Sequence, residues 1–391
     1  MRFLVFLRRA GDEEDAMPGT EGLTQARSGA NDEFYTQLVD IEREINAYLA
    51  FDPDVFRGKT VLLPCDDPKW SNFTKYFAQN FSALGLKKLV STGYAVRSKR
   101  DLGLLPGFGD EPEAGDESLE HGTIFTLDRD TNGNGVIDID DLVGRPMEGD
   151  GDFRSAEVRA LRDEADVIVT NPPFSLFREF VAWLVESRKR FLVIGNVNAI
   201  TYKEVFPLVQ GNRMWMGESI HSGDREFGVP EHYPLRAAGC RVDADGKKYI
   251  RVKGVRWFTN LDHGMRHEPL QCMTMADNLR FNRHKDFRAT GYVRYDNYDA
   301  IEVPYTDAIP SDCDGVMGVP ITFLDKYCPE QFKILGIMDR QNSSGLRTKK
   351  YGPSDSEKYN DLNARGVVKT ENGYQSLYAR ILIRKRKDAI A

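Results

Sequence analysis

A short apolar segment that ends in two prolines constrains the fold of this chain more than any other stretch. Residues 165–170 are rich in β-branched side chains, and Asn171-Pro172-Pro173-Phe174 follows directly. Such a run is typical of a strand buried on both faces of a parallel sheet. Neither proline can donate to a β-ladder, and Pro172 holds Asn171 extended, so the strand must end there. A polar and aromatic tip therefore lies at the carboxyl end of a strand, where open α/β sheets bind ligands.

Strands and helices alternate on both sides of this segment. The sequence predicts strands at 60–64, 86–92, 167–170 and 190–195, and helices at 38–50, 77–84, 153–164 and 176–187. This alternation is typical of a doubly wound α/β fold with a parallel sheet. The length of 391 residues favours about two domains.

Charge is distributed unevenly. The net charge is −7 for the whole chain, −12 for residues 1–200 and +5 for residues 201–391. A basic second half favours a phosphate-bearing partner, although chance scatter of surface charge is an alternative. The five cysteines include no C-x-x-C pair, which is typical of reduced thiols in a cytoplasmic protein. Residues 3–7 are too short for a membrane span or a signal-peptide core, so we expect a cytoplasmic monomer without a membrane partner.

The proline-bounded tip suits one kind of reaction. An exocyclic amine on a nucleobase is a poor nucleophile because its lone pair is delocalised into the ring. The Asn171 side-chain oxygen and the Pro172 carbonyl, side by side, can accept both amine hydrogens and so free the lone pair. Phe174 offers a face on which a flipped base can stack. A structural loop with a buried phenylalanine is the alternative.

The first strand-to-helix turn is the place for a nucleotide-like cofactor in such a sheet. Here the turn reads Asp67-Pro68-Lys69-Trp70-Ser71-Asn72-Phe73, where many methyltransferases carry glycines. Asp67 and the amides of the following helix fit the aminoacyl end of S-adenosylmethionine. An Asx turn that only caps the helix is the competing interpretation.

Seven segments form a specific combination. They are 32–37 (DEFYTQ), 65–68 with 71–73 (CDDP and SNF), 149–155 (GDGDFRS), 170–179 (TNPPFSLFRE), 194–196 with 198–204 (IGN and NAITYKE), 255–261 (VRWFTNL) and 309–320 (IPSDCDGVMGVP). With these motifs the chain resembles the EcoRI-type family of adenine-specific DNA methyltransferases. The resemblance covers most of residues 31–385 and implies a class I S-adenosylmethionine-dependent methyltransferase fold with a C-terminal α+β target-recognition region.

The resemblance also implies roles at matched positions. The implied cofactor-binding residues are Phe34, Tyr35, Thr36, Asp67, Pro68, Ser71, Asp152 and Phe153. The implied catalytic residues are Asn171, Pro172, Pro173 and Phe174. The motif order matches the γ arrangement, in which target recognition is C-terminal. The chain departs from the pattern because residues 71 and 73 are not glycines and no acidic residue after the second strand is available for the ribose.

The implied organisation has three parts. We expect a disordered segment at 1–30, a catalytic domain at 31–225 with an insertion at 100–148, and a target-recognition region at 226–391. The implied reaction transfers a methyl group from S-adenosylmethionine to N6 of a flipped adenine in double-stranded DNA. The enzyme would act beside a separate cognate restriction endonuclease, or as an orphan or phage enzyme. The rival functions are methylation of cytosine N4, RNA or a protein amide, and DNA binding by an inactive relative.

Basic residues in the second half are interleaved with aromatic ones, a pattern that suits phosphate contacts and base stacking. Solvated strand edges are the alternative. The basic residues are Lys253, Arg256, Arg266, Arg280, Arg283, Lys285 and Arg288, and the aromatic ones are Trp257, Phe258, Phe281 and Phe287.

The insertion contains a segment that fits a twelve-residue Ca²⁺ loop, with glycine at the sixth position. Its last ligand is Asp rather than the usual Glu, and a predicted strand at 123–127 precedes it instead of a helix. A plain acidic surface loop is the competing interpretation. The candidate ligands are Asp130, Asn132, Asn134, the Val136 carbonyl, Asp138 and Asp141.

Overall fold

The structure of this chain is a computed structural model that describes residues 34–95, 120–221, 223–230, 233, 235, 239–340 and 345–387. The expected disorder of residues 1–30 and the start of the 100–148 insertion lie outside these ranges. No helix in the described ranges has the length and apolar character needed to cross a membrane.

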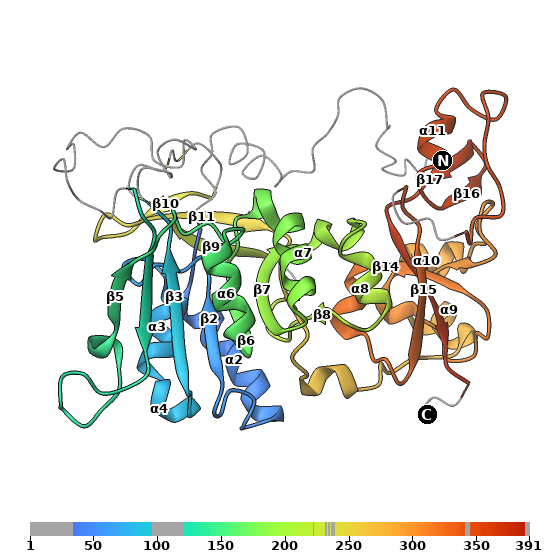
Figure 1. Ribbon diagram of the computed structural model, residues 1–391. Coiled ribbons are helices and arrows are strands. Elements are labelled where there is room, and N and C mark those ends of the chain that lie inside the picture. Colours follow the sequence, from blue (N-terminus) through green and yellow to red (C-terminus); the bar gives the residue numbers. More distant parts are fainter. Residues whose placement is uncertain are drawn as a thin grey trace.

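An eight-stranded mixed sheet forms the centre of the fold, in the order β5-β4-β3-β2-β6-β7-β12-β8 (Figure 1). The four central strands are parallel, as predicted: β2 (Thr60–Leu63), β3 (Lys88–Gly93), β6 (Val167–Thr170) and β7 (Arg190–Asn196). The outer strands are antiparallel, which the sequence did not predict: β4 (Thr123–Leu127), β5 (Val143–Pro146), β12 (Val255–Thr259) and β8 (Trp215–Met216).

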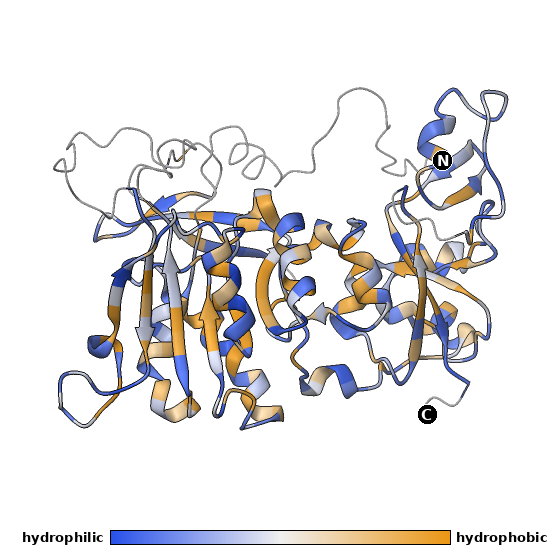
Figure 2. Ribbon diagram, viewed as in Figure 1, coloured by the Kyte–Doolittle hydropathy of each residue, from blue (hydrophilic) through white to orange (hydrophobic). Residues whose placement is uncertain are grey.

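Helices cover both faces of the central strands. On one face α2 (Leu38–Phe51), α3 (Asn72–Gln79) and α4 (Phe81–Leu84) share a buried cluster with Val61 and Leu63. On the other, α6 (Ala156–Glu164) and α7 (Phe177–Ser187) share a second cluster with Leu62. Neighbouring residues of a strand point to opposite faces, so β2 contributes to both clusters. Figure 2 shows the apolar residues concentrated in these strands and on the helix surfaces that face them.

Local signals fix where the helices begin and end. The Ser71 hydroxyl accepts a hydrogen bond from the Phe73 amide at the start of α3 (3.0 Å), and the Ser155 hydroxyl accepts one from the Val158 amide at the start of α6 (3.2 Å). The helix predicted at 77–84 is interrupted at Asn80, and α4 ends at Gly85, whose φ of 63° favours glycine.

A small antiparallel sheet brings the N-terminal segment to the large sheet. Its order is β1 (Tyr35–Thr36), β9 (Asp224–Val229), β11 (Lys248–Lys253) and β10 (Arg241–Val242). β1 pairs with β9 through Tyr35 and Gly228. In Figure 1 the strands β9, β10 and β11 cross the upper ends of the large sheet. This sheet therefore joins a segment at residues 35–36 to one near residue 228.

The C-terminal part contains a second four-stranded sheet, ordered β13 (Ile301–Glu302), β14 (Met317–Pro320), β18 (Arg380–Lys385) and β15 (Phe332–Ile337). The helices α9 (Met275–Phe281) and α10 (Lys285–Thr290) lie beside it, and the hairpin of β16 (Val367–Thr370) and β17 (Gly373–Ser376) lies with α11 (Tyr359–Leu362) (Figure 1). The remaining short helices are α8 (Phe206–Gln210), η2 (Ile139–Asp141), η3 (Phe174–Leu176), η4 (Val197–Thr201), η5 (Gly264–His267), η6 (Thr306–Ala308) and η7 (Ile321–Lys326).

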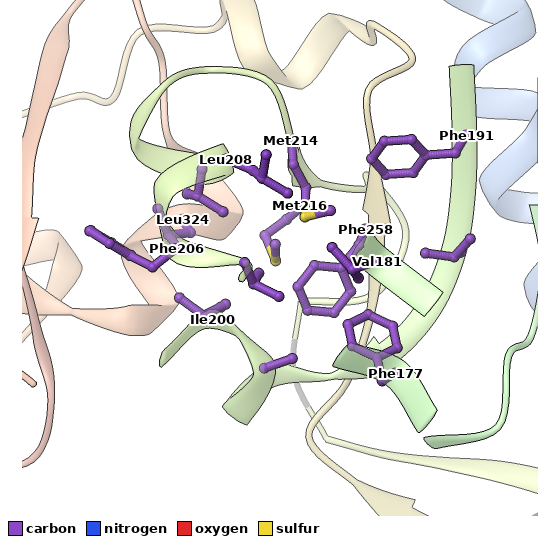
Figure 3. Close-up of a cluster of buried hydrophobic side chains, with 14 of the residues drawn as sticks. Phe177, Val181, Phe191, Ile200, Phe206, Leu208, Met214, Met216, Phe258 and Leu324 are labelled. Carbon is purple, nitrogen blue, oxygen red and sulfur yellow. The ribbon is translucent and has the colours of Figure 1, made fainter. Parts of the chain in front are cut away.

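One hydrophobic cluster spans the predicted division at residue 225. Figure 3 shows Leu324 of η7 beside Phe206 and Leu208 of α8, with Phe258 of β12 and Phe177 of α7 in the same cluster. β12 itself completes the large sheet although it falls within 226–391. The division into domains stays a prediction, and the central sheet draws strands from both sides of it.

A buried ion pair links β12 of the large sheet to η7, both within residues 226–391. The Arg256 guanidinium of β12 donates to both carboxylate oxygens of Asp325 in η7, at 3.0 and 3.2 Å. Burial raises the pKa of Asp325 to about 6, although Arg256 acts to lower it. Burial therefore disfavours the charged form of Asp325 more than Arg256 favours it. Such a pair stabilises little compared with apolar residues, but it is costly to break on one side only.

We expect Asp325→Ala to lower the free energy of unfolding by about 3–5 kcal/mol, because it leaves the guanidinium buried without its counter-charge. Urea denaturation at pH 8, where Asp325 is ionised, measures this loss. The double variant Arg256→Met with Asp325→Leu removes both charges and should regain most of the stability. An unchanged urea midpoint in Asp325→Ala would show that the pair does not support the β12–η7 contact.

Candidate active site

The side-chain amide of Asn171 has its nitrogen end hydrogen-bonded and its oxygen end without a partner among the described residues. Its Nδ2 donates to the Phe34 carbonyl oxygen at 2.6 Å, and since a carbonyl only accepts, this bond identifies the nitrogen end of the amide. Its Oδ1 is buried and has no hydrogen-bond partner among the described residues. Buried acceptors normally have a hydrogen-bond donor as partner. An acceptor without one, at the end of a strand, therefore points to a donor that a ligand supplies.

Three aromatic rings pack together beside Asn171. Phe174 meets Phe34 edge-on with ring centroids 5.5 Å apart, and Phe227 of β9 meets Phe34 at 5.9 Å and Phe174 at 6.4 Å. Phe174 is only 9% exposed. Only the small exposed part of the Phe174 ring is therefore available for the predicted stacking. The rest of the ring is buried, as the alternative interpretation expected.

The Phe34–Thr36 segment lies between the catalytic tip and the predicted cofactor turn. The Thr36 carbonyl accepts from Asn72 Nδ2 at 2.7 Å, while the Phe34 carbonyl accepts from Asn171. The Thr36 hydroxyl is buried without a partner among the described residues. Tyr35 stacks on Trp70 of the turn at 6.3 Å, and Trp70 is 56% exposed. The structure thus brings together two motifs that are about 135 residues apart in the sequence.

The turn after β2 contains the Asx turn that was one interpretation of its sequence, and cofactor binding by the turn stays a prediction. Asp67 Oδ1 accepts from the Lys69 amide at 2.9 Å, which is an Asx turn that continues through the partly buried Pro68, and Ser71 caps α3. The carboxylate of Asp67 also approaches the end of β3, because a Cβ on Gly93 would lie 2.7 Å from Asp67 Oδ2. The turn is therefore closely packed against its neighbouring strand, as glycine at 93 allows.

Asp152 and Phe153 point in different directions at the carboxyl end of β3. The Ala95 amide donates to the Asp150 carbonyl at 2.8 Å, which places this segment beside the strand end. Burial acts to raise the pKa of Asp152, but hydrogen bonds from Arg154 hold it below its ordinary value. Phe153 is buried against Phe180 at 5.1 Å and is part of the core. Of the two, only Asp152 lies where a ligand could reach it.

Asp66 is the polar residue at this edge that the sequence reasoning did not single out. It is 4% exposed, and its carboxylate accepts from the hydroxyls of Ser71 and Thr170. Burial raises its pKa to about 7, while the two hydroxyl groups act to lower it. The available signal was the pair of consecutive acids, Asp66 and Asp67, after a strand. Because neighbouring residues point in opposite directions, only one of the two can face outward at this edge, and the other must point inward.

The predicted DNA contacts fall into a buried and an exposed set. Arg256 is buried and committed to Asp325, so it is not available to DNA, and Arg266 is buried over the Trp215 ring. The predicted aromatic partners Trp257, Phe258 and Phe287 are core residues, whereas Phe281 is 60% exposed beside Arg280. The exposed basic residues are Lys253, Arg280, Arg283, Lys285 and Arg288. Of these, Arg283 pairs with Asp307 at 2.7 Å.

The loop at 130–141 is held by its own backbone amides. Asp130 accepts from the amides of Gly133 and Gly135, and the buried Asp141 accepts from those of Thr131, Asn132 and Asp138. The side chains of Asn132, Asn134 and Asp138 likewise accept from loop amides. Within the described ranges no group of three or more His, Cys, Asp or Glu side chains is placed to hold a metal ion. The calcium site stays a prediction.

Comparison with known proteins shows the family to which this chain belongs. Residues 22–386 match the family model described as adenine-specific methyltransferase EcoRI. The chain is 43% identical to the Type II methyltransferase M.EcoRI of Escherichia coli over 313 residues, which are 80% of this chain and 88% of that protein. It is 33% identical to the Type II methyltransferase M.MpnI of Mycoplasma pneumoniae over 370 residues, 94% and 98% of the two chains. No solved structure matches it significantly. The chain therefore belongs to the EcoRI family of adenine-specific methyltransferases, and it is a site-specific DNA methyltransferase that uses S-adenosylmethionine.

Proposed function

We propose that the enzyme methylates N6 of an adenine extruded from double-stranded DNA, and that Asn171 and Pro172 hold the amino group. The observation that supports this most strongly is the buried, unpartnered Oδ1 of Asn171. A base inside a duplex cannot present its amine to a residue at the end of a buried strand, so the target must leave the stack.

The two acceptors act by position. Asn171 Oδ1 accepts one amine hydrogen and the Pro172 carbonyl accepts the other, which draws the nitrogen toward tetrahedral geometry. The bond from Nδ2 to the Phe34 carbonyl keeps the amide from rotating its nitrogen toward the substrate. Pro172 and Pro173 stiffen the backbone that carries both groups. No group is reorganised during the reaction, so the stabilisation is available as soon as the base is seated.

The same edge fits the cofactor. S-adenosylmethionine, when bound, supplies a methyl group on a sulfonium that is electrophilic without metal or covalent assistance. The residues we propose to hold it are Phe34, Tyr35, Thr36, Asp67, Pro68, Ser71 and Asp152, and Phe153 supports Asp152 from the core. The buried, unpartnered Thr36 hydroxyl supports this assignment, as does the Asp67 carboxylate beside the end of β3.

We further assign the central sheet to the doubly wound class I methyltransferase fold. Four adjacent parallel strands, covered by helices on both faces, support this assignment, as does the meeting of the motifs at their carboxyl ends. The order of the motifs favours the γ arrangement, with target recognition in the C-terminal α+β part. The exposed residues of α9 and α10 form the DNA surface that we propose, together with Lys253 of β11. The names of the relatives favour an enzyme of a restriction–modification system, whose endonuclease acts separately.

Asn171→Ala should reduce methyl transfer by roughly 10²–10³-fold, the usual effect of removing one preorganised group at a reacting centre. Asn171→Asp should also fail, because a carboxylate oxygen would replace the Nδ2 that donates to the Phe34 carbonyl. Tritiated-methyl transfer measures turnover, and gel shift tests whether DNA binding is retained. Asn80→Ala is the matched control, since Asn80 also donates to a backbone carbonyl (2.9 Å) but lies between α3 and α4.

Mass spectrometry of digested product should find N6-methyladenine and separate the rival substrates. Finding N4-methylcytosine, methylated RNA or a methylated protein amide instead would show that the enzyme acts on that substrate and not on adenine. Near-normal turnover in Asn171→Ala would contradict the proposed mechanism. Wild-type protein that neither binds nor uses S-adenosylmethionine would favour the inactive DNA-binding alternative. Long-read sequencing of DNA from an expressing host then gives the recognition site.

Trp70 offers a direct test of the cofactor turn. Trp183 and Trp257 are buried, Trp215 is partly buried, and Trp70 is the exposed tryptophan of the chain. We expect S-adenosylmethionine to change the tryptophan emission, because binding at the turn changes the surroundings of the Trp70 ring. The change should disappear in Trp70→Phe and persist in Trp215→Phe. Persistence in Trp70→Phe would place the cofactor elsewhere.

The α9–α10 surface should contribute phosphate contacts. We expect Lys285→Ala and Arg288→Ala each to weaken DNA binding at every sequence tested and to reduce the slope of log K against log salt by about 1. Fluorescence anisotropy across a salt series measures both quantities. Lys87→Ala is the control, because this exposed residue directly precedes β3 at the opposite, amino end of the central strands. Unchanged slopes in both variants would remove this surface from the proposal.

A further inference from the structure

Asp66 connects the cofactor turn to the catalytic tip through its two carboxylate oxygens. Oδ1 accepts from the Ser71 hydroxyl at 2.6 Å, and Oδ2 accepts from the Thr170 hydroxyl at 2.5 Å. Ser71 begins α3 at the end of the cofactor turn. Thr170 is the last residue of β6 and is bonded directly to Asn171. One buried side chain therefore touches both halves of the candidate site.

The backbone of Asp66 is fixed as firmly as its side chain. Its amide donates to the Thr92 carbonyl of β3 at 3.1 Å, and its carbonyl accepts from the Thr74 hydroxyl of α3 at 2.8 Å and from the Ser91 hydroxyl. These contacts leave the carboxylate little freedom to follow a displaced neighbour. A shift of β6 relative to the turn would have to break a hydrogen bond to Asp66.

A purely structural link does not require an acid at this position. Among the described residues no ion pair includes Asp66, and its carboxylate is held by neutral hydroxyls alone. Burying a carboxylate without a cation is unfavourable, which is why its pKa is raised. Above pH 7, where Asp66 is mainly ionised, both of its oxygens accept, whereas an amide has only one accepting oxygen. The carboxylate therefore makes both hydroxyls donate toward it.

We propose that Asp66 is a positioning residue for methyl transfer, which sets the place of Asn171 and Pro172 relative to the cofactor turn through Thr170 and Ser71. The proposal rests on the function proposed above. Asp66 does not touch the substrate in this arrangement; it acts through the two hydroxyls. Since a misplacement of about 1 Å at a reacting centre can cost 10²-fold in rate, a loosened link should appear in kcat before it appears in binding.

The test removes one arm of the link at a time. Thr170→Val keeps the branched shape of the side chain and loses the hydroxyl, and we expect kcat to fall roughly 10- to 100-fold with the KM for DNA nearly unchanged. Thr170→Ser restores the hydroxyl and should recover most of that loss. Ser71→Ala, on the other arm, should raise the KM for S-adenosylmethionine more than it lowers kcat. Combining Asp66→Asn with Thr170→Val should be no worse than Asp66→Asn alone.

Asp166→Asn is the structural control. Asp166 Oδ2 accepts from the Thr60 amide at 2.8 Å and so links β6 to β2 at their amino ends, away from the site. We expect this variant to lower the melting temperature without changing kcat per folded enzyme. The same behaviour in Thr170→Val and Asp66→Asn would overturn the positioning role. If Asp66→Asn does not fold, Thr170→Val and Thr170→Ser still decide the question. An active Asn171→Ala would instead overturn the proposed function, so the two failures are distinguishable.

Discussion

The hydrogen bond from Asn171 Nδ2 to the Phe34 carbonyl joins residues that are 137 positions apart, and the rest of the site depends on it. It joins the residue before β1, which pairs with β9, to the residue after β6, which pairs with β2 and β7. The orientation of the amide is thus a product of tertiary structure rather than of the tetrapeptide. A loosened β1 would free the Asn171 side chain to rotate, and the oxygen that we propose accepts from the amine would lose its fixed direction.

The central sheet supplies the rigidity that this bond requires. β6 lies between β2 and β7, is buried along its whole length and has apolar clusters on both faces. A strand in that position cannot slide by one residue without exchanging its two sets of side chains between the clusters. The double proline then releases the chain from the ladder at a fixed point. Position along the strand, rather than any special local geometry, sets where Asn171 stands.

The features that could be predicted from the sequence are those with local causes. β6 was predicted to the residue because the prolines end it, and the other parallel strands were found because doubly buried strands are continuous apolar runs. β1 and β8 were missed, since strands of only two residues owe their existence to the partners they meet. β12 was missed because Arg256 interrupts its apolar run. The side-chain directions of Arg256, Phe153 and Asp66 were missed for a related reason. Their motifs give the residue type, but burial depends on which neighbour packs over each position.

Three buried carboxylates show how the chain satisfies such groups, and the comparison distinguishes Asp66. Asp325 meets a guanidinium. Glu44 accepts from the Tyr48 hydroxyl and from the amides of Glu218 and Ser219, and Gly217 passes so close that a Cβ would collide with it. Both of these acids join segments away from the catalytic edge. Asp66 accepts from only two neutral hydroxyls, the weakest of the three sets of donors, and burial raises its pKa to about 7. This acid, which has the weakest donors of the three, lies between the turn that we propose binds the cofactor and Asn171, so the placement that it provides bears directly on the proposed reaction.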